Sequence, residues 1–474
     1  MSRRWTVLLV SCTGAFLAFL DATIVNIAFP DIRRSFPGAS LSGLSWVLSA
    51  YNIVFAALLV PGGRLADAIG RRRVFVGGLL LFTLASAACA AAQSPEQLVA
   101  ARVLQAVGGA ALIPTSIAFL LAEFPIGMRA TAMSLWGAAA AVAAAAGPSL
   151  GGLLIEWSSW RAIFAVNLPV GVLAAVYGMR LLSESRREEG EPLPDLAGVV
   201  LVTGAIGLLA LAIVQGPTWG WGDWRIVSSF AGAAVLTPLT VLRSLAHPSP
   251  VLEVALFRIR SLAVANAGTL VFSAAFYAMI LCHVLFLTQV WGYSVLDAGL
   301  ALSPAPLCAA IAAAPAGRIA DRAGQRVLAV PGTILFACGN AWFVYEVGTQ
   351  PAFASEWLPG AVLTGTGVGI TVAALGSAAV AEVPSESFGL GSAISSMSRQ
   401  IGAVLGVAIL VAIVGTPSPA GAPAAFDHGW RFASLSAIGA ALISLGLGRG
   451  PAGATREDLA VAGPATAALG GEGS

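Results

Sequence analysis

Two oppositely charged side chains lie inside long apolar stretches of this sequence, where they could bind and release a proton. Asp21 lies about two-thirds of the way along the apolar run 6–29, and Arg102 lies five residues into the run 97–121. Ionisable groups inside a membrane are costly and are therefore candidates for function. If the two runs are antiparallel helices, both charges lie about 8–12 Å from the same membrane edge. We expect either an ion pair that protonation of Asp21 releases or a purely structural pair.

A second group of polar and aromatic side chains lies in the apolar runs and could line a substrate cavity. Phe272 and Phe276 share one helix face at spacing i, i+4. Histidine is the side chain that changes charge near neutral pH, and His283 is the one inside a run. Packing between helices or against lipid is the alternative for each. The cavity candidates are Asn26, Gln105, Phe272, Phe276, Tyr277 and His283, whereas Arg399 is a mid-span charge for which the sequence shows no partner.

All 25 basic side chains are arginines, and this removes several kinds of chemistry. A P-loop needs a lysine on the phosphates, so the chain is not its own ATPase, and a lysine Schiff base is equally impossible. The five cysteines lie singly in apolar runs without a C-x-x-C pair, and the three histidines are too dispersed for a metal cluster. We therefore expect no metal, no cofactor and no enzymatic activity.

The elements that carry these residues are predicted to be membrane-spanning helices. Of the 474 residues, 58% are apolar and only 10% are charged, with a mean hydropathy of +0.87, whereas soluble domains carry about 25% charge. This composition excludes a soluble enzyme, a nucleic-acid-binding protein and a secreted disulfide scaffold. Because a span needs about 20 apolar residues, the sequence predicts an all-α polytopic protein with fourteen transmembrane helices. They are placed at residues 6–29, 44–63, 74–93, 97–121, 131–156, 162–182, 196–215, 225–243, 261–290, 296–317, 327–347, 357–381, 388–414 and 430–448.

The arginines predict the orientation of these helices. With the N-terminus inside, 18 arginines fall in inside segments and 5 in outside segments, in agreement with the positive-inside rule. We expect a multi-pass protein of the bacterial inner membrane with both termini in the cytoplasm. The predicted divisions are an N-terminal six-helix half at 1–183, a hinge with two intervening helices at 184–260, a C-terminal six-helix half at 261–448 and a disordered cytoplasmic tail at 449–474.

An internal repeat at an offset of 254 residues supports the two halves. Each copy lies between the second and third helix of a six-helix set, and two parallel homologous halves are a transporter architecture. Topogenic positive charge alone could explain the loop, but its spacing favours a charged latch that stabilises one access state. The loop residues are Gly63, Arg64, Asp67, Gly70, Arg71 and Arg72 in the first copy and Gly317, Arg318, Asp321, Gly324 and Arg326 in the second.

Four stretches resemble motifs of a known family, namely Leu20–Pro30, Gly62–Phe75, Ala101–Gly109 and Gly147–Gly152. Together with the repeat, they are similar to the major facilitator superfamily in its fourteen-span drug:proton antiporter branch. The resemblance implies that Asp21 and Arg102 take part in coupling. It also implies a kinked fifth helix, at Gly147, Pro148, Gly151 and Gly152, that restricts leak and favours export. The run Ala138–Ala146 lacks the family's further glycines, although alanine also permits close helix packing.

The function that the resemblance implies is proton-coupled export of lipophilic or amphipathic small molecules. The expected partners are the substrate, the proton and the lipid bilayer, without nucleic acid, and the chain is expected to be a monomer. Mainly apolar cavity helices with one acid favour neutral or monocationic compounds over divalent cations. A dedicated natural-product or metabolite transporter of the same fold is the alternative. A non-transporting receptor would tolerate decay of the charged pair and the loops, and neither has decayed.

Overall fold

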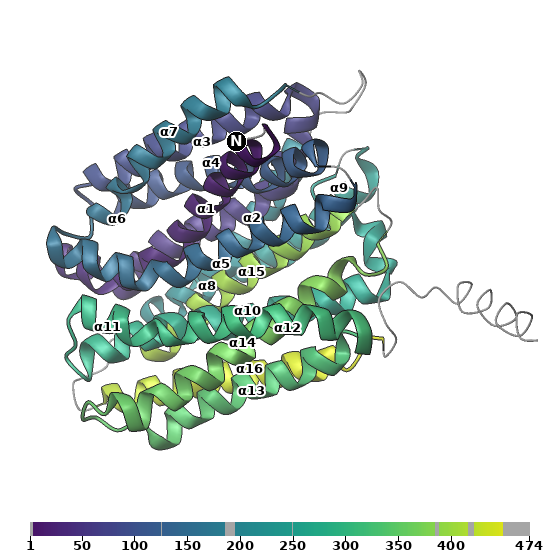
Figure 1. Ribbon diagram of the computed structural model, residues 1–474. Coiled ribbons are helices and arrows are strands. Elements are labelled where there is room, and N and C mark those ends of the chain that lie inside the picture. Colours follow the sequence, from purple (N-terminus) through teal and green to yellow (C-terminus); the bar gives the residue numbers. More distant parts are fainter. Residues whose placement is uncertain are drawn as a thin grey trace, which may run out of the picture.

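The computed structural model describes residues 3–124, 126–184, 195–248, 250–383, 388–415 and 421–448, and every regular element in these ranges is helical (Figure 1). The structure does not describe the side-chain surroundings of five predicted loop residues, namely Arg64, Asp67, Gly317, Arg318 and Asp321. The predicted tail 449–474 lies outside the described residues altogether. The helices are α1 Arg3–Ser35, α2 Leu41–Ile69, α3 Arg71–Ala91, α4 Pro95–Glu123, α5 Ile126–Trp157, α6 Ala162–Ala165, α7 Asn167–Leu181, α8 Leu196–Trp219, α9 Trp224–Ala246, η1 Val254–Arg258, α10 Arg260–Gln289, α11 Val295–Leu302, α12 Pro304–Ala323, α13 Arg326–Glu346, η2 Phe353–Trp357, α14 Leu358–Val380, α15 Phe388–Val414 and α16 Ala422–Ser444.

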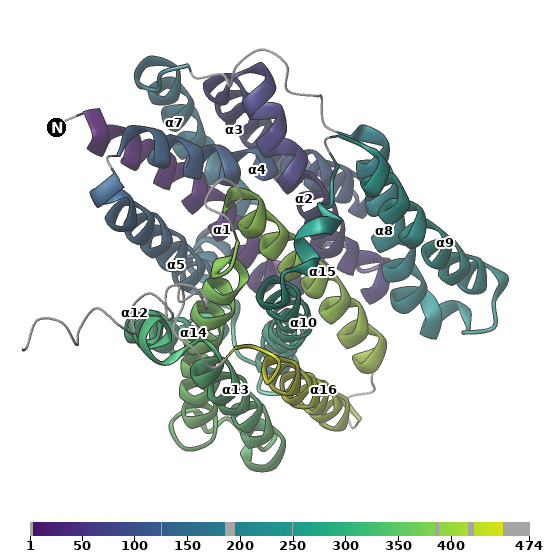
Figure 2. The same ribbon diagram turned by 90° about the vertical axis from the view of Figure 1, so that its right-hand side faces the viewer.

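These helices form two bundles with a helical hairpin against one flank (Figures 1 and 2). Helices α1 to α7 make up the first bundle, α10 to α16 make up the second, and α8 and α9 form the hairpin. Helix α8 packs on both α2 and α15, where Ile53, Val202 and Val404 belong to one buried apolar cluster. The hairpin therefore touches both bundles at once.

Twelve helical segments in the described part of the chain are long and apolar enough to cross a membrane. Helix α5, with 32 residues, and α16, with 23, have similar lengths but are not among the twelve. The described part of the chain is therefore all-helical with twelve such segments, and the count of fourteen spans stays a prediction.

Two of the predicted spans are built from two helices each. The run 162–182 contains α6 and α7, and the run 296–317 contains α11 and α12. The second break lies between Leu302 and Pro304, and a proline has no N–H to continue the backbone ladder. The last helix begins at Ala422, eight residues before its predicted start, because the charges of Asp427 and Arg431 interrupt the apolar pattern there.

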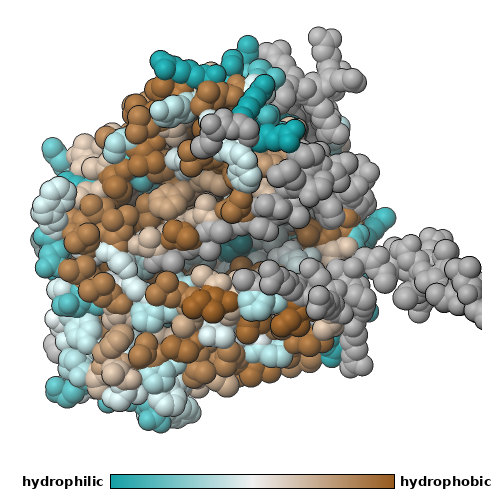
Figure 3. All heavy atoms as spheres, in the orientation of Figure 1, coloured by the Kyte–Doolittle hydropathy of each residue, from teal (hydrophilic) through white to brown (hydrophobic). Residues whose placement is uncertain are grey.

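The outer surface carries large apolar side chains that water would not solvate well. Leu84, Ile311 and Leu442 are 68%, 74% and 64% exposed. Apolar side chains gather in a broad region over the face in view in Figure 3, with hydrophilic residues towards its margins. Such a surface is suited to acyl chains, in which each helix satisfies its own backbone hydrogen bonds.

Each copy of the repeat has a glycine with positive φ between its second and third predicted spans. Gly70 lies between α2 and α3 with φ 115°, and Gly324 lies between α12 and α13 with φ 89°. Only glycine adopts this backbone region without a steric penalty from Cβ. The sequence repeat is therefore matched by a positive-φ glycine at the same position of each copy.

Candidate functional site

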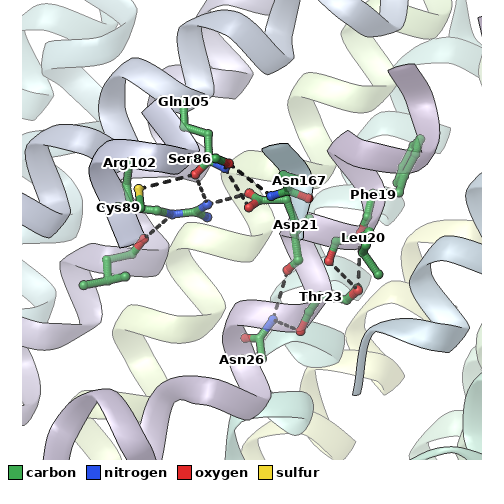
Figure 4. A network of polar contacts seen from close by, with 12 residues as sticks. Phe19, Leu20, Asp21, Thr23, Asn26, Ser86, Cys89, Arg102, Gln105 and Asn167 are labelled. Carbon is green, nitrogen blue, oxygen red and sulfur yellow. Dashed lines mark hydrogen bonds and ion pairs between the residues drawn. The ribbon is translucent and has the colours of Figure 1, made fainter. Parts of the chain in front are cut away.

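Three side chains from α1 and α4 form a charged network in the interior of the first bundle (Figure 4). Arg102 Nη1 donates to Asp21 Oδ2 at 2.5 Å and to Gln105 Oε1 at 2.6 Å. Gln105 Nε2 donates to Asp21 Oδ1 at 2.9 Å, so both carboxylate oxygens accept a bond. Asp21 and Arg102 are 0% and 1% exposed. Because each charge neutralises the other, the pair adds no net charge to the bundle.

A second layer of polar groups from α3 and α7 orients this network. Gln105 Nε2 also donates to Ser86 Oγ at 2.7 Å, and Asn167 Nδ2 donates to the same oxygen at 3.1 Å. Helices α3 and α4 can approach this closely because Gly78 and Gly108 face each other. A Cβ on Gly108 would lie 2.6 Å from the Gly78 carbonyl oxygen.

Helix α2 supplies the remaining contacts of Arg102. Its Nε donates to the Val47 carbonyl oxygen at 3.2 Å, and its guanidinium lies 3.9 Å from the centre of the Tyr51 ring. A cation over an aromatic face is stabilised by the ring's negative quadrupole. These contacts would remain if Asp21 took up a proton, so Arg102 has an alternative set of partners when the ion pair is lost.

A small cavity of about 20 Å³ lies between the two bundles, next to the stretch of α1 that carries Asp21. Ala18, Phe19 and Ala22, which flank Asp21 on α1, line it. The whole lining comprises Ala18, Phe19, Ala22, Phe55, Leu59 and Ile113 from the first bundle and Tyr277, Ser396, Arg399 and Gln400 from the second. The first-bundle wall is thus apolar, and the second-bundle wall is polar.

The predicted cavity candidates lie in different parts of the structure. Tyr277 lines the cavity, and Gln105 belongs to the ion-pair network. Asn26 lies about one turn beyond Asp21 and donates to the carbonyl oxygen of Ala22 at 3.0 Å (Figure 4). Phe272, which is 2% exposed, and Phe276 pack inside the second bundle, where their rings stack with centres 6.4 Å apart.

His283 lies in an aromatic cluster of the second bundle. Its ring centre lies 4.5 Å from that of Phe343, 4.8 Å from Trp357 and 6.1 Å from Trp430. The imidazole is buried, and its Nε2 has no hydrogen-bond partner among the described residues. These surroundings separate it from both the charged network and the cavity lining.

The described part of the first loop is held by an acid from the end of its own bundle. Glu184 Oε1 accepts from the Arg72 backbone N–H at 3.1 Å, at the start of α3. Its Oε2 lies 3.8 Å from Arg72 Nε and 3.7 Å from Arg73 Nε. A Cβ on Gly70 would lie 2.5 Å from Glu184, so the glycine makes room for the carboxylate. Arg71 also has contacts in the structure, and Arg326 begins α13 in the second copy.

The glycines of the fifth-helix motif bring α5 into close contact with both bundles. Gly147 contacts Thr23, and a Cβ on Gly151 would lie 2.6 Å from Ile27 Cγ2, both on α1. On another face, a Cβ on Gly152 would lie 2.8 Å from Leu296 Cα of α11, and Gly299 packs on the Pro148 carbonyl. Hydroxyls of Ser149 and Ser303 form a hydrogen bond across the same contact. The motif therefore joins the first bundle to the second.

Several partners in these sites were not singled out from the sequence. Ser86, Asn167, Tyr51 and Glu184 become visible once the packing of α1, α2, α3, α4 and α7 is known. Asn167 had the clearest signal, because it is an amide within the apolar run 162–182.

Comparison with known proteins identifies related sequences along nearly the whole chain. A family model described as Major Facilitator Superfamily matches residues 11–406. The chain is 36% identical over 408 residues to the multidrug resistance protein Stp of Mycobacterium tuberculosis, across 86% of this chain and 75% of that protein. It is 34% identical over 418 residues to a probable actinorhodin transporter of Streptomyces coelicolor, across 86% of this chain and 72% of that protein.

A solved structure supports the same fold. The crystal structure of a bacterial homolog of the human lysosomal transporter Spinster matches with a TM-score of 0.63 at 17% identity. The match covers 94% of this chain and 98% of that chain. At this level of identity the likeness concerns the arrangement of the helices alone.

Proposed function

Because the chain belongs to the Major Facilitator Superfamily, we propose that it is a proton-coupled exporter that moves lipophilic or amphipathic small molecules out of a bacterial cell. The family and its named members indicate a multi-pass membrane transporter rather than an enzyme. The names of the two relatives describe multidrug resistance and actinorhodin transport, and export of such compounds is carried over to this chain as part of the proposal.

The proposed topology is that of the fourteen-span drug:proton antiporter branch. Adding α5 and α16 to the twelve apolar segments gives fourteen spans. The proposed halves are residues 1–183 and 261–448, with α8 and α9 between them, and both termini lie in the cytoplasm. The chain is proposed to act as a monomer.

The observation that supports proton coupling best is the position of the Asp21–Arg102 pair beside the cavity. A deprotonated Asp21 is stabilised by Arg102 and Gln105, whereas a protonated Asp21 no longer attracts Arg102. Residues adjacent to Asp21 on α1 line the cavity, so a shift of α1 against α4 changes the site where a substrate would lie. Coupling follows if the two access states differ in their affinity for the proton and for the substrate.

The loops and the α5 motif are proposed to control the access state. Glu184 already holds the start of α3 next to Arg72 and Arg73, as a charged latch at one end of the first bundle would require. The proposed latch extends to Asp67 in the first copy and Asp321 in the second. The close contact of α5 with α11 is proposed to seal the molecule against leak.

The decisive test replaces Asp21 with asparagine, which keeps the shape of the side chain and fixes it in an uncharged state. We expect Asp21→Asn to abolish accumulation of a lipophilic probe against its gradient in everted vesicles with an imposed proton gradient. Asp21→Glu is expected to retain part of this activity because it keeps a carboxylate. Asp31→Asn, on the same helix and paired with Arg34, is the matched control and should transport as the wild-type protein does. Uphill transport by Asp21→Asn would place the proton site elsewhere.

A further inference from the structure

The polar wall of the cavity carries a cation that the coupling network does not use. Arg399 lies in the middle of α15 and lines the cavity with Tyr277, Ser396 and Gln400. Among the described residues that line the cavity, Arg399 is the only charged one. Its Nη2 donates a hydrogen bond at 3.1 Å to a neutral partner on its own helix, the Ser396 hydroxyl.

Arg399 differs in this respect from the buried Arg102 and from the more exposed Arg243. Arg102 pairs with Asp21, and Arg243 pairs with Asp195 at 3.1 Å. Among the described residues, no carboxylate lies within 4.0 Å of the Arg399 guanidinium. An uncompensated cation inside a membrane protein is costly, and its free energy falls when an anion arrives.

In this conformation the cavity has a volume of about 20 Å³, which is room for about one water molecule. A larger ligand therefore requires the two bundles to separate, and the two walls indicate the chemistry of that ligand rather than its shape. The wall of the first bundle offers apolar surface from Phe19, Phe55 and Ile113. The opposite wall offers the guanidinium, with the Tyr277 ring and the Gln400 amide beside it, and Gln400 Oε1 is buried without a described partner. A planar guanidinium binds a carboxylate through two parallel hydrogen bonds. The matching ligand has an apolar body and one anionic group.

We propose that Arg399 binds the anionic group of the transported compound and that the favoured substrates are lipophilic organic anions, such as aromatic carboxylates. The proposal rests on the proposed export function and departs from the expectation of neutral or monocationic substrates. Asp21 cannot serve as the counter-charge of a cationic substrate while it is paired with Arg102, which neutralises its charge and donates a hydrogen bond to its Oδ2.

Binding to the purified full-length protein in detergent tests this proposal without relying on transport. The probes are anthraquinone-2-carboxylate and anthraquinone-2-carboxamide, which share one aromatic body and differ in charge. We expect the wild-type protein to bind the carboxylate about tenfold more tightly than the amide, as charge-assisted hydrogen bonds require. Equal affinity for the two probes, or tighter binding of the amide, would overturn the proposal.

Substitution of Arg399 assigns the preference to this residue. In Arg399→Gln the ratio of the two affinities should fall to about one, and Arg399→Lys should keep an intermediate ratio because it retains the charge but not the planar fork. Arg431→Gln, on the exposed face of α16, removes an arginine far from the lining and should keep the wild-type ratio. A wild-type ratio in Arg399→Gln contradicts the proposal, and Arg399→Lys provides a readout if the glutamine variant does not fold.

A parallel transport measurement separates this proposal from the proposed function. Proton-driven accumulation of either probe in everted vesicles supports export, whatever the charge preference. Preferential, Arg399-dependent binding without proton-driven movement of either probe would support the anion site and contradict the exporter. Proton-driven movement of the amide with equal affinities would support the exporter and contradict the anion site.

Discussion

Asp21 and Arg102 neutralise each other in the interior of the first bundle, so the loss of one has a different effect from the loss of both. Each side chain is at most 1% exposed. Removal of one partner from a buried pair leaves an unpaired charge, whereas neutral replacement of both partners leaves none. This difference separates the contribution of the pair to stability from its role in coupling.

We predict that Arg102→Met alone lowers the free energy of unfolding by about 3–5 kcal/mol. Combining it with Asp21→Asn should recover most of this loss, because no charge then remains buried. Thermal unfolding in detergent measures both effects. The double variant should fold and yet fail to concentrate substrate, and uphill transport by it would leave the pair with a purely structural role.

The Asp31–Arg34 pair near the end of α1 provides the matched control. Its atoms lie 3.2 Å apart, and the Arg34 side chain is 64% exposed. Arg34→Met should change the free energy of unfolding by about 1 kcal/mol or less, because water solvates the remaining carboxylate. A large loss in this variant would mean that burial does not explain the effect at Arg102.

At this scale the sequence predicts charged residues better than it predicts their neutral partners. Ionisable residues inside apolar runs are rare, so Asp21 and Arg102 stand out, and the depth of each along its helix predicts that they can meet. Serine and asparagine in a membrane helix can bond either to a carbonyl of their own helix or to a neighbouring helix, and the sequence does not distinguish the two. Only the packing of α3 against α4 and of α7 against α3 reveals that Ser86 bonds to Gln105 and that Asn167 bonds to Ser86.

Among the elements, α5 is the helix whose small residues determine how the two bundles meet. A side chain at Gly152 would meet the backbone of α11, which cannot move aside as the end of a flexible side chain can. Gly137 on the same helix has no atom within 4 Å of an added Cβ. The same glycine-to-alanine substitution at the two positions therefore distinguishes the loss of a close helix contact from the general effect of replacing a glycine in α5.

We predict that Gly152→Ala lowers the rate of transport at least several-fold and that Gly137→Ala leaves it unchanged. The added methyl group of the first variant pushes α5 from α11, whereas the second adds a methyl group in open space and favours the helix by about 0.5–1 kcal/mol. Efflux assays at matched expression levels measure the difference. Equal activities would show that the contact of α5 with α11 is not part of the transport cycle.

Helix positions are predicted well where an apolar run is long and uninterrupted, and less well where a run contains a break. The run 388–414 coincides with α15 to the residue. The pairs α6–α7 and α11–α12 each appear as a single run, because apolar composition does not register a turn inside the membrane. Such breaks depend on local backbone geometry, which a count of apolar residues does not contain.

At the scale of the whole molecule, the proposed topology fixes which connections face each side of the membrane. In a variant without Cys12, Cys89, Cys282, Cys308 and Cys338, we predict that new cysteines at Ser40 and Thr218 react with an impermeant thiol reagent applied to intact cells. A cysteine at Ser183 should react only after the membrane is opened. All three positions are exposed in the structure, so access to the reagent depends on the membrane alone. Labelling at Ser183 in sealed cells would contradict the fourteen-span topology.

The position of α8 makes the two long seams between the bundles unequal. Helix α8 covers the junction of α2 with α15, and Val202 and Ile206 pack into it. Among the described residues, no comparable hairpin covers the opposite junction, where α5 meets α11 and α12 (Figure 2). In a bilayer, one seam would therefore face protein and the other would face acyl chains. A compound dissolved in the acyl chains could therefore approach the junction of α5 with α11 and α12 from the bilayer, whereas α8 blocks the same approach to the junction of α2 with α15. The hairpin thus makes the two lateral sides of the molecule unequal, which two six-helix bundles alone would not do.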